Sequence, residues 1–541
     1  MEMMNHTLHS LLLLCLLGIG VSLNGFSQDM DLKWVRHITS DSGNVDPINV
    51  YTDPHGNTYF YGQFSYDSVR FDTIVDGIQW GVGGVMIKYD SLGNLIRYWL
   101  PKGIKPSAGI DYRTLIPTEH GLYMAISLSD TVILPNETIH SYGEADVLIE
   151  RWDKNDSIIW RTRIAGGEVE VWNLQVTSNG DVIGQGHFRD SMSVNGTTFY
   201  TDNKYARQWD NFLFRLNDKG NVKWVKVVSK GGEHVRHGLL VDKSDNIYFA
   251  ASFNDTIRFS NTTLYHHLTI FNNKIFLAKF SPKGEEIWVK SFGSESKNDA
   301  LYDFEMDSKD RIQVLYANGD TDVEIDGIPI PKGSVWLDFN TDGQLQEVVH
   351  VFENCTEFCI NRNDEKLATN SPSSKVLFQK YSTQNQFTNI QALAGNDFLG
   401  SSFLIDVNKH DQVVVAGPFS NEIIIGVDTL NTKGGRDTYI AFYQDHTVTT
   451  VNEARELDYD FQIYPNPAVD RVTLVLDLPN PQKITIRLTD IQGQEVYYKD
   501  LGSTQAGNHE LQLDLSSYAA GFYQLTCQTG NTPICRKLVL H

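Results

Sequence analysis

The sequence contains little positive charge. It has 541 residues, with 45 Lys and Arg against 67 Asp and Glu, and a formal net charge of −22. Binding to nucleic acid is driven by Lys and Arg side chains that displace counterions from the phosphates. The composition therefore argues against a nucleic-acid partner, and a surplus of carboxylates is typical of the surface of a soluble exported protein.

Long apolar runs are also missing, apart from one near the N-terminus. Residues 11–23 read LLLLCLLGIGVSL. This run is too short to cross a bilayer, and it has the length of the apolar region of a signal peptide. We expect a signal peptide over residues 1–27 and no transmembrane anchor after it, although residues 1–10 lack the usual Lys and Arg.

No compact catalytic motif is present. The chain has no G-x-S-x-G, H-E-x-x-H or P-loop sequence. Residues 231–238 combine one Glu with two His in an order that matches no zinc motif, which favours a solvated loop. Residues 338–345 begin like a calcium-binding loop, but Val349 stands where that loop needs Glu. The sequence predicts no metal, no cofactor and no catalytic residue that can be named.

Cysteines are few, and four remain after the expected signal peptide. Cys527 and Cys535 flank a Gly-Asn turn. A hairpin centred on Asn531 would place them opposite each other, and we therefore predict a disulfide. Cys355 and Cys359 are spaced C-x3-C with no further metal ligand nearby, which indicates a second disulfide or two free thiols.

A unit of about 60 residues repeats along the chain. Each unit has four short runs with alternating apolar positions, joined by turns such as DKSDN and NDKG. Four antiparallel strands with tight turns are typical of a propeller blade. Each unit also carries Asp, then Ser or Thr, then an apolar residue. Examples are QFSYDSVRF (63–71), SLSDTVIL (127–134), HFRDSMSV (187–194) and SFNDTIRF (252–259).

The third-strand pattern occurs seven times, which predicts an all-β fold with a seven-bladed β-propeller over residues 28–445. Residues 32–38 form a fourth strand without a unit, and residues 437–443 form a third strand without its fourth. Pairing these two segments would complete the last blade and remove an open edge. The units resemble the SBBP-type β-propeller repeats of exported bacterial proteins. The Asp-Ser/Thr-apolar triplet also resembles the acceptor of a bacterial O-glycosylation system, besides its structural interpretation as a turn.

The last 80 residues differ in composition from the repeats. Residues 446–459 are polar and read as a linker, and residues 460–541 alternate as the strands of a small β-sandwich. Four signatures there resemble the type A C-terminal sorting domain of the type IX secretion system: YPNP, TDIQGQEV (489–496), AAGFYQL and a terminal RKLVL. The resemblance implies export to the cell surface or the medium, recognition by the type IX machinery, removal of the domain, and release or attachment to lipopolysaccharide. The matching residues are Tyr464, Pro465, Asn466, Pro467, Gly521, Tyr523 and Lys537.

Binding residues concentrate in variable loops on a rigid scaffold. The long connections between second and third strands, and between units, hold aromatic and imidazole side chains suited to stacking on a glycan or protein ligand. The sequence therefore predicts a secreted or cell-surface protein with a non-enzymatic binding or structural role. The alternative is a polysaccharide-active or other hydrolase with catalytic residues scattered over loops. The candidate ligand-binding residues are Tyr205, Trp209, His234, Tyr265 and His267.

Overall fold

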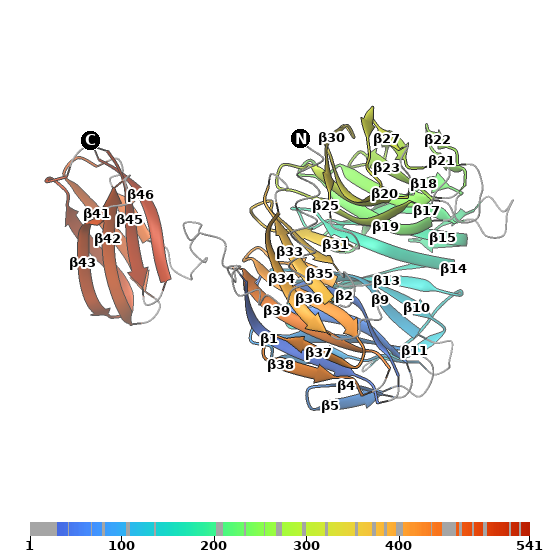
Figure 1. Ribbon diagram of the computed structural model, residues 1–541, viewed down its shortest axis with the longest axis horizontal. Coiled ribbons are helices and arrows are strands. Elements are labelled where there is room, and N and C mark those ends of the chain that lie inside the picture. Colours follow the sequence, from blue (N-terminus) through green and yellow to red (C-terminus); the bar gives the residue numbers. More distant parts are fainter. Residues whose placement is uncertain are drawn as a thin grey trace, which may run out of the picture. The chain divides into compact units, whose positions relative to one another are not determined.

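The computed structural model describes residues 30–445 and 461–540, apart from short stretches of which the longest are 202–208 and 396–403. Every regular element within these residues is a β-strand, as the sequence predicted (Figure 1). The chain divides into two compact units, Met1–Asp445 and His446–His541.

The first unit contains seven consecutive sets of four antiparallel strands among its described residues. Neighbouring strands of a set are hydrogen-bonded in chain order, except that β1 supplies the fourth strand of the last set. The first set is β2 (Val45–Thr52), β3 (Thr58–Ser65), β6 (Val82–Tyr89) and β7 (Leu95–Trp99); the second is β9 (Gly109–Thr118), β10 (Gly121–Ser129), β13 (Asp146–Asp153) and the first half of β14 (Ile158–Val176); the third is the second half of β14, β15 (Val182–Val194), β17 (Asp210–Leu216) and β18 (Val222–Lys230). The fourth set is β19 (His234–Val241), β20 (Ile247–Phe253), β23 (Lys274–Phe280) and β24 (Glu286–Phe292); the fifth is β25 (Ala300–Met306), β26 (Ile312–Asn318), β29 (Gly333–Phe339) and β30 (Leu345–His350). The sixth set is β31 (Cys355–Ile360), β32 (Lys366–Asn370), β33 (Lys375–Tyr381) and β34 (Phe387–Gly395); the seventh is β35 (Leu404–Val407), β36 (Gln412–Phe419), β39 (Asp437–Asp445) and β1 (Met30–Thr39).

The two ends of the first unit pair with each other. Strand β1 lies antiparallel to β39, with Val35 opposite Ala441 and Ile38 opposite Thr438. The predicted pairing of residues 32–38 with residues 437–443 is confirmed. Because these segments are some 400 residues apart in sequence, the last set exists only when the whole unit is present.

Hairpins between second and third strands cover the edges of neighbouring sets. Strand β4 pairs with β1, β21 with β18 and β37 with β34, so each hairpin reaches the last strand of the preceding set. Paired edges cannot template the addition of another chain. The strands outside the seven sets are β4 (Ser68–Phe71), β5 (Ile74–Gly77), β8 (Lys102–Gly103), β11 (Thr131–Leu134), β12 (Glu137–His140), β16 (Thr197–Tyr200), β21 (Ile257–Phe259), β22 (Thr263–Leu264), β27 (Glu324–Ile325), β28 (Ile328–Pro329), β37 (Glu422–Ile425) and β38 (Asp428–Asn431).

The repeated Asp-Ser/Thr-apolar triplet begins these hairpins. Asp130 and Asp190 turn the chain with φ values of 56° and 65°, a region that Asp tolerates better than most residues. The apolar residue that follows is fully buried in four repeats. The triplet therefore has a complete structural explanation. The four buried residues are Val69, Val132, Met192 and Ile257.

Tryptophans on some fourth strands join one set to the next. The indole N–H of Trp160 donates to the Asp218 carbonyl at 2.9 Å, and that of Trp34 donates to the Ser91 carbonyl at 3.2 Å. The ring of Trp160 packs on Gly220, where an added Cβ would come within 2.6 Å of the ring. Trp34 thus makes between the last set and the first the same contact that Trp160 makes within the array.

The second unit consists of two sheets that share an apolar core. Val472 and Leu474 from one sheet are buried against Ile486 and Leu525 from the other. One sheet contains β40 (Phe461–Tyr464), β41 (Arg471–Leu478) and β44 (Gly507–Asp514); the other contains β43 (Glu495–Thr504), β42 (Gln482–Asp490), β45 (Gly521–Thr529) and β46 (Thr532–Leu540).

The predicted disulfide between Cys527 and Cys535 is wrong. Thr529 lies opposite Thr532, so that Cys527 pairs with Ile534 and Cys535 pairs with Thr526. The turn is centred between residues 530 and 531 and not on Asn531 as predicted. Because adjacent positions of a strand point to opposite faces, this shift of half a residue takes the two cysteines out of register. Cys527 is a free, buried thiol.

Candidate functional site

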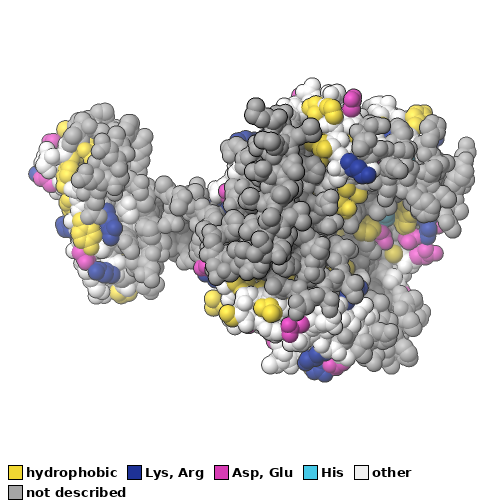
Figure 2. Space-filling model, viewed as in Figure 1, with side chains coloured by type: hydrophobic (Ala, Val, Ile, Leu, Met, Phe, Trp, Pro, Cys, Tyr) yellow, Lys and Arg dark blue, Asp and Glu magenta, His cyan; other side chains and the backbone are white. Residues whose placement is uncertain are grey.

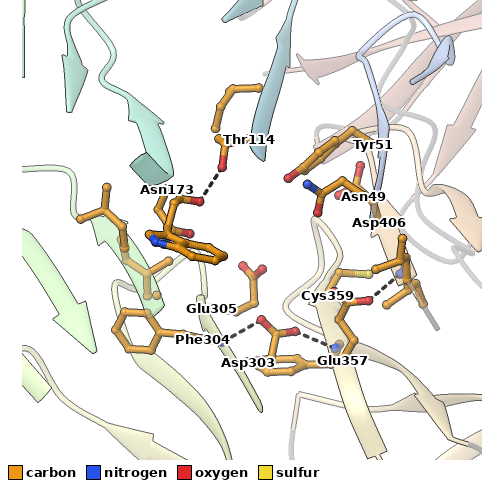
Figure 3. Close-up of a pocket in the computed structure, with 18 of the residues that line it drawn as sticks. Asn49, Tyr51, Thr114, Asn173, Asp303, Phe304, Glu305, Glu357, Cys359 and Asp406 are labelled. Carbon is orange, nitrogen blue, oxygen red and sulfur yellow. Dashed lines mark hydrogen bonds between the residues drawn. The ribbon is translucent and has the colours of Figure 1, made fainter. Parts of the chain in front are cut away.

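A cavity of about 470 Å³ lies where the first strands of the seven sets come together (Figure 3). Strands β2, β9, β14, β19, β25, β31 and β35 each contribute lining residues. The first strands of successive sets contact one another, and β35 contacts β2. The volume is in the range of pockets that hold small ligands.

Alternation along each strand gives the cavity two layers of side chains. Residues two apart point to the same side of a strand, so each first strand sends two positions into the space. The layer nearer the following turn is Tyr51, Ile116, Gln175, Leu240, Glu305, Cys359 and Asp406. The layer behind it is Asn49, Thr114, Asn173, Gly238, Asp303, Glu357 and Leu404.

The charged residues in the described part of the cavity lining are acidic. Asp303 and Glu305 come from β25, Glu357 from β31 and Asp406 from β35. We call these four residues the acidic side. On the face shown in Figure 2, acidic and basic side chains are intermingled among the described residues.

Three carboxylates of the acidic side are held by backbone N–H groups of the next first strand. The N–H of Phe358 donates to Asp303 Oδ2 at 2.8 Å. The N–H of Ile405 donates to Glu357 Oε2 at 3.2 Å, and the N–H of Thr52 donates to Asp406 Oδ2 at 2.7 Å. Each carboxylate therefore bridges two adjacent strands, and its position is fixed before any ligand arrives.

The described links between the remaining first strands are uncharged, and we call this part the neutral side. Thr114 Oγ1 donates to the Trp172 carbonyl at 2.6 Å, and Gln175 Nε2 donates to the Leu239 carbonyl at 3.0 Å. At Gly238 an added Cβ would lie 2.6 Å from Phe304, so β19 and β25 approach too closely for any side chain at that position.

The protonation of the acidic side is shifted by its surroundings. Burial raises the pKa of Asp406 to about 6, despite its hydrogen bond from Thr52. Burial, and then the charges of Asp303 and Asp406, raise the pKa of Glu305 well above its usual value. Burial and the same group of carboxylates raise the pKa of the Cys359 thiol, which is 6% exposed. A thiol kept protonated in this way is a poor nucleophile.

A second cavity, of about 400 Å³, adjoins the first at the turns that follow β14, β19 and β25. It shares Gln175, Leu240 and Glu305 with the larger cavity. Its outer part carries one cationic side chain, Lys243, whose ammonium group donates to the Ser308 carbonyl. The remaining charged lining residues are acidic: Asp242, Asp245, Asp307 and Asp310.

Neither Trp209 nor Tyr265, the candidate residues whose side chains the structure describes, is among the lining residues of the cavity. The Trp209 ring lies 4.1 Å from the His187 ring, which in turn meets Trp172, a cavity-lining residue, at 5.8 Å. Tyr265 follows β22 and is 70% exposed. His234 begins β19. Tyr205 and His267 lie outside the described residues.

Sequence reasoning missed the cavity. The signal was present in the first strands of the last three units, where Asp303 and Glu305, then Glu357, then Asp406 occupy the alternate positions that other units fill with uncharged residues. Aligning the first strands of all units would have revealed it.

The described residues contain neither a metal-ligand cluster nor a membrane-spanning helix. Within the described residues, no group of three or more His, Cys, Asp and Glu side chains is placed to hold a metal ion. In the same part of the chain, no helix is long and apolar enough to cross a membrane.

The sorting-motif residues lie in the second unit. Tyr464 ends β40, and its hydroxyl donates to Glu510 Oε1 at 2.9 Å. Gly521 begins β45, Tyr523 packs against the core from the same strand, and Lys537 is in β46. Residues 465–467 lie outside the described residues.

Comparison with solved structures gives only distant similarity. A protein of unknown function from Dyadobacter fermentans DSM 18053 is 9% identical, with a TM-score of 0.39, over 77% of this chain and 100% of its own. A polysaccharide lyase of family PL25, an ulvan lyase, is 11% identical with a TM-score of 0.39, over 74% and 97%. PorZ, a surface component of the type IX secretion system of Porphyromonas gingivalis, is 10% identical with a TM-score of 0.22, over 92% and 81%.

The C-terminal unit has a clear family. No curated protein matches the chain as a whole. Residues 462–541 match the family described as the secretion system C-terminal sorting domain. This match confirms the resemblance that the sequence signatures indicated. The chain therefore carries a type IX secretion sorting domain at its C-terminal end, and the protein is secreted or displayed at the cell surface.

Proposed function

We propose that the protein is a seven-bladed β-propeller that the type IX secretion system exports as a non-enzymatic binding protein, with the central cavity as its binding site. The observation that carries the proposal is that all seven first strands line one cavity of ligand size. A propeller places the first strand of every blade around its axis, where a central cavity forms.

Three junctions between the last strand set and the first support a closed array. Strand β1 completes the set of β39. Trp34 bonds to Ser91 as Trp160 bonds to Asp218. Asp406 bonds to Thr52 as Glu357 bonds to Ile405. The contacts that link neighbouring sets inside the array thus recur between its two ends.

The division of labour along the chain follows from this proposal. Residues 1–27 serve as a signal peptide, residues 28–445 form the propeller, and residues 446–459 link it to the sorting domain at 460–541. Deleting residues 460–541 should leave the protein in the periplasm, as cell fractionation would show. If the shortened chain still reaches the surface or the medium, the sorting domain does not direct export.

A hydrolase is the second candidate, because one observation favours it. Glu305 has a raised pKa and lies beside Asp303, and a carboxyl with a raised pKa next to a second carboxyl is the pattern of a general acid and its partner. Against this, Asp303, Glu357 and Asp406 each bind backbone N–H groups and so serve the scaffold.

The two candidates can be separated with the purified secreted protein. Arrays of glycans and peptides would be screened for binding, and the same ligands would be analysed for cleavage products by mass spectrometry. We expect binding without cleavage, lost in Glu305→Gln. Cleavage that Glu305→Gln abolishes would establish the hydrolase. Binding that is unchanged in Glu305→Gln would show that the binding site is not in the cavity.

A further inference from the structure

We infer that the outer hairpins of three consecutive strand sets bind a neutral polysaccharide chain on exposed tyrosine rings. The rings are those of Tyr142, Tyr200 and Tyr265, which we call the tyrosine row. They lie at the ends of the outer hairpins of the second, third and fourth sets. This site goes beyond the proposed function, because no residue of the row lines the central cavity.

The three rings are among the most exposed large side chains of the first unit. Tyr142 is 80% exposed, Tyr200 71% and Tyr265 70%. Single exposed apolar side chains are common on protein surfaces and need no explanation. Three exposed tyrosines on the hairpins of consecutive sets are a repeated feature, and a repeated feature requires a cause.

The register of the hairpin in the third set turns a ring and a hydroxyl outward together. Ser191 lies directly opposite Tyr200. The next pair is Met192 and Phe199, and Met192 is fully buried. Opposite residues share one face of a hairpin, and successive residues alternate between the two faces. The Ser191 hydroxyl and the Tyr200 ring therefore lie side by side on the outer face.

The neighbouring hairpins repeat this arrangement. The register of β21 and β22 puts Tyr265 beside Thr256, one residue before the buried Ile257. Strands β21 and β22 lie at the periphery of the first unit (Figure 1). In the second set Thr131 lies opposite His140, and Thr131 Oγ1 is 2.8 Å from His140 Nδ1. The Ser or Thr of the repeated triplet thus has a ring beside it in three consecutive sets.

Tyr142, two residues after His140, is held in place by its neighbours. Its backbone N–H donates to Asp146 Oδ2 at 2.9 Å, and the Arg163 guanidinium lies 4.0 Å from the centre of its ring. Arg163 in turn donates from Nε to Asp146 Oδ2 at 2.8 Å. Groups that are fixed in advance lose little entropy when a ligand binds.

The fold does not require a ring at these places. In the first and last sets, the positions that correspond to Tyr200 are Gly77 and Asn431, which lie opposite Ser68 and Glu422. Hairpins of the same construction therefore form without a ring. The rings in three adjoining sets are better explained by a ligand that extends from one set to the next.

The chemistry of the row suits a sugar polymer. A pyranose has an apolar face of C–H bonds that can stack on an aromatic ring, and its hydroxyls can pair with protein hydroxyls. The outer face of β15 and β16 supplies further hydroxyls, since Ser193 Oγ and Thr198 Oγ1 lie 2.7 Å apart beside the Ser191 and Tyr200 pair. A polymer with a repeating apolar face can meet one ring on each strand set.

Two other kinds of partner fit less well. The formal net charge of −22 repels an anionic polymer. A partner protein needs a continuous surface of several hundred Å² with an apolar centre, whereas these rings stand on separate hairpins among polar side chains. The row therefore favours a neutral polysaccharide.

Native electrophoresis of the full-length protein through gels that contain a polysaccharide tests the inference. The probes are glucomannan and hydroxyethylcellulose, whose β-1,4-linked sugars present flat apolar faces, and dextran, whose α-linked chain does not. We expect the first two to retard the protein more than dextran does. Fragments of glucomannan should bind more tightly once they are long enough to reach a second ring. Absence of binding to either β-linked polymer, or equal affinity for short and long fragments, would overturn the inference.

Matched variants locate the binding. Tyr200→Ala and Tyr265→Ala should each weaken glucomannan binding several-fold, and the double variant should weaken it at least tenfold. Tyr200→Phe keeps the ring and should bind nearly as the wild type does. Tyr498→Ala removes an exposed tyrosine of the second unit and should change nothing. Because all these side chains are exposed, the urea midpoints should not move. Unchanged binding in the double variant, or an equal loss in Tyr498→Ala, would overturn the inference.

Glu305→Gln distinguishes this site from the central cavity. Binding of the polymer to the tyrosine row should be unchanged in Glu305→Gln. If the polymer is lost in Glu305→Gln and kept in the double tyrosine variant, it uses the cavity, so the row is wrong while the proposed function stands. If the row binds the polymer and no ligand depends on Glu305, the inference holds and the cavity is not the binding site.

Discussion

The acidic and neutral sides of the cavity both join adjacent first strands by hydrogen bonds from side chains to the backbone, but the side chains donate on one side and accept on the other. On the neutral side, Thr114 and Gln175 donate to backbone carbonyls of the next strand. On the acidic side, Asp303, Glu357 and Asp406 accept from backbone N–H groups of the next strand. Either arrangement joins adjacent first strands, so packing alone does not require acids. The described links therefore do not explain by themselves why carboxyls concentrate on three neighbouring strands.

The largest effect should come from removing a bridging carboxylate. Asp303 accepts from the N–H groups of both Phe304 and Phe358. Asp303→Ala leaves both groups unpaired, and we expect a loss of about 2–4 kcal/mol in the free energy of unfolding. All ten tryptophans lie in the first unit, so denaturant unfolding followed by tryptophan fluorescence reports on that unit alone.

The neutral side provides the control for this prediction. Thr114→Ala removes one donor to a carbonyl, which should cost about 1 kcal/mol. Asp303→Asn keeps an acceptor oxygen and should fall between the two. If Asp303→Ala costs no more than Thr114→Ala, the carboxylates do not hold the strands, and the comparison between the two sides fails.

The second prediction concerns pH. Burial raises the pKa of Asp406 from its ordinary 3.8 to about 6, which means that the folded state binds this proton more tightly than the unfolded state. The contribution is fully present below pH 4 and is lost as the pH rises through 6, by an amount on the order of 3 kcal/mol. Asp406→Asn should therefore be more stable than the wild type at pH 8 and equal to it near pH 4.

Urea midpoints of the two proteins at several pH values between 4 and 8 measure this effect. The groups that face Asp406 are the carboxyls of Asp303, Glu305 and Glu357, the Cys359 thiol and the Tyr51 hydroxyl. Glu305 also has a raised pKa, so the Asn variant keeps part of the slope. Parallel curves for the wild type and Asp406→Asn would show that Asp406 does not titrate as its burial requires.

Local patterns made most of the fold predictable. The alternation and turns of each unit predicted its strands, and the orphan segments at 32–38 and 437–443 predicted the pairing that β1 and β39 make. The prediction of a disulfide between Cys527 and Cys535 was wrong because a shift of half a residue in the centre of the turn changes every residue pair of the hairpin. The correct pairing and the incorrect disulfide both concern residues that are neighbours in sequence or within one sheet.

The cavity was not predictable in the same way. Its lining comes from seven strands spread from β2 to β35. In each strand alone, an acid at an alternate position is indistinguishable from an ordinary exposed residue. Trp209 was chosen for its loop, yet it lies against His187, and that contact depends on how β15 and the loop before β17 meet. A site built from many distant strands can be recognised in the sequence only when the equivalent strands of all units are aligned.

The smallest expected effect is at Cys359, on the acidic side. The carboxyls around it and its burial raise the pKa of its thiol, and the side chain is 6% exposed. Cys527, in the core of the second unit, also has a raised pKa, but from burial alone. A thiol reagent at pH 8 should therefore modify neither residue in the folded protein, as mass spectrometry of the labelled peptides would show. In denaturant just below the unfolding midpoint, the order in which Cys359 and Cys527 are labelled would reveal whether the acidic side opens before the second unit. Rapid labelling of Cys359 without denaturant would mean that its thiol is neither buried nor held protonated by the acidic side.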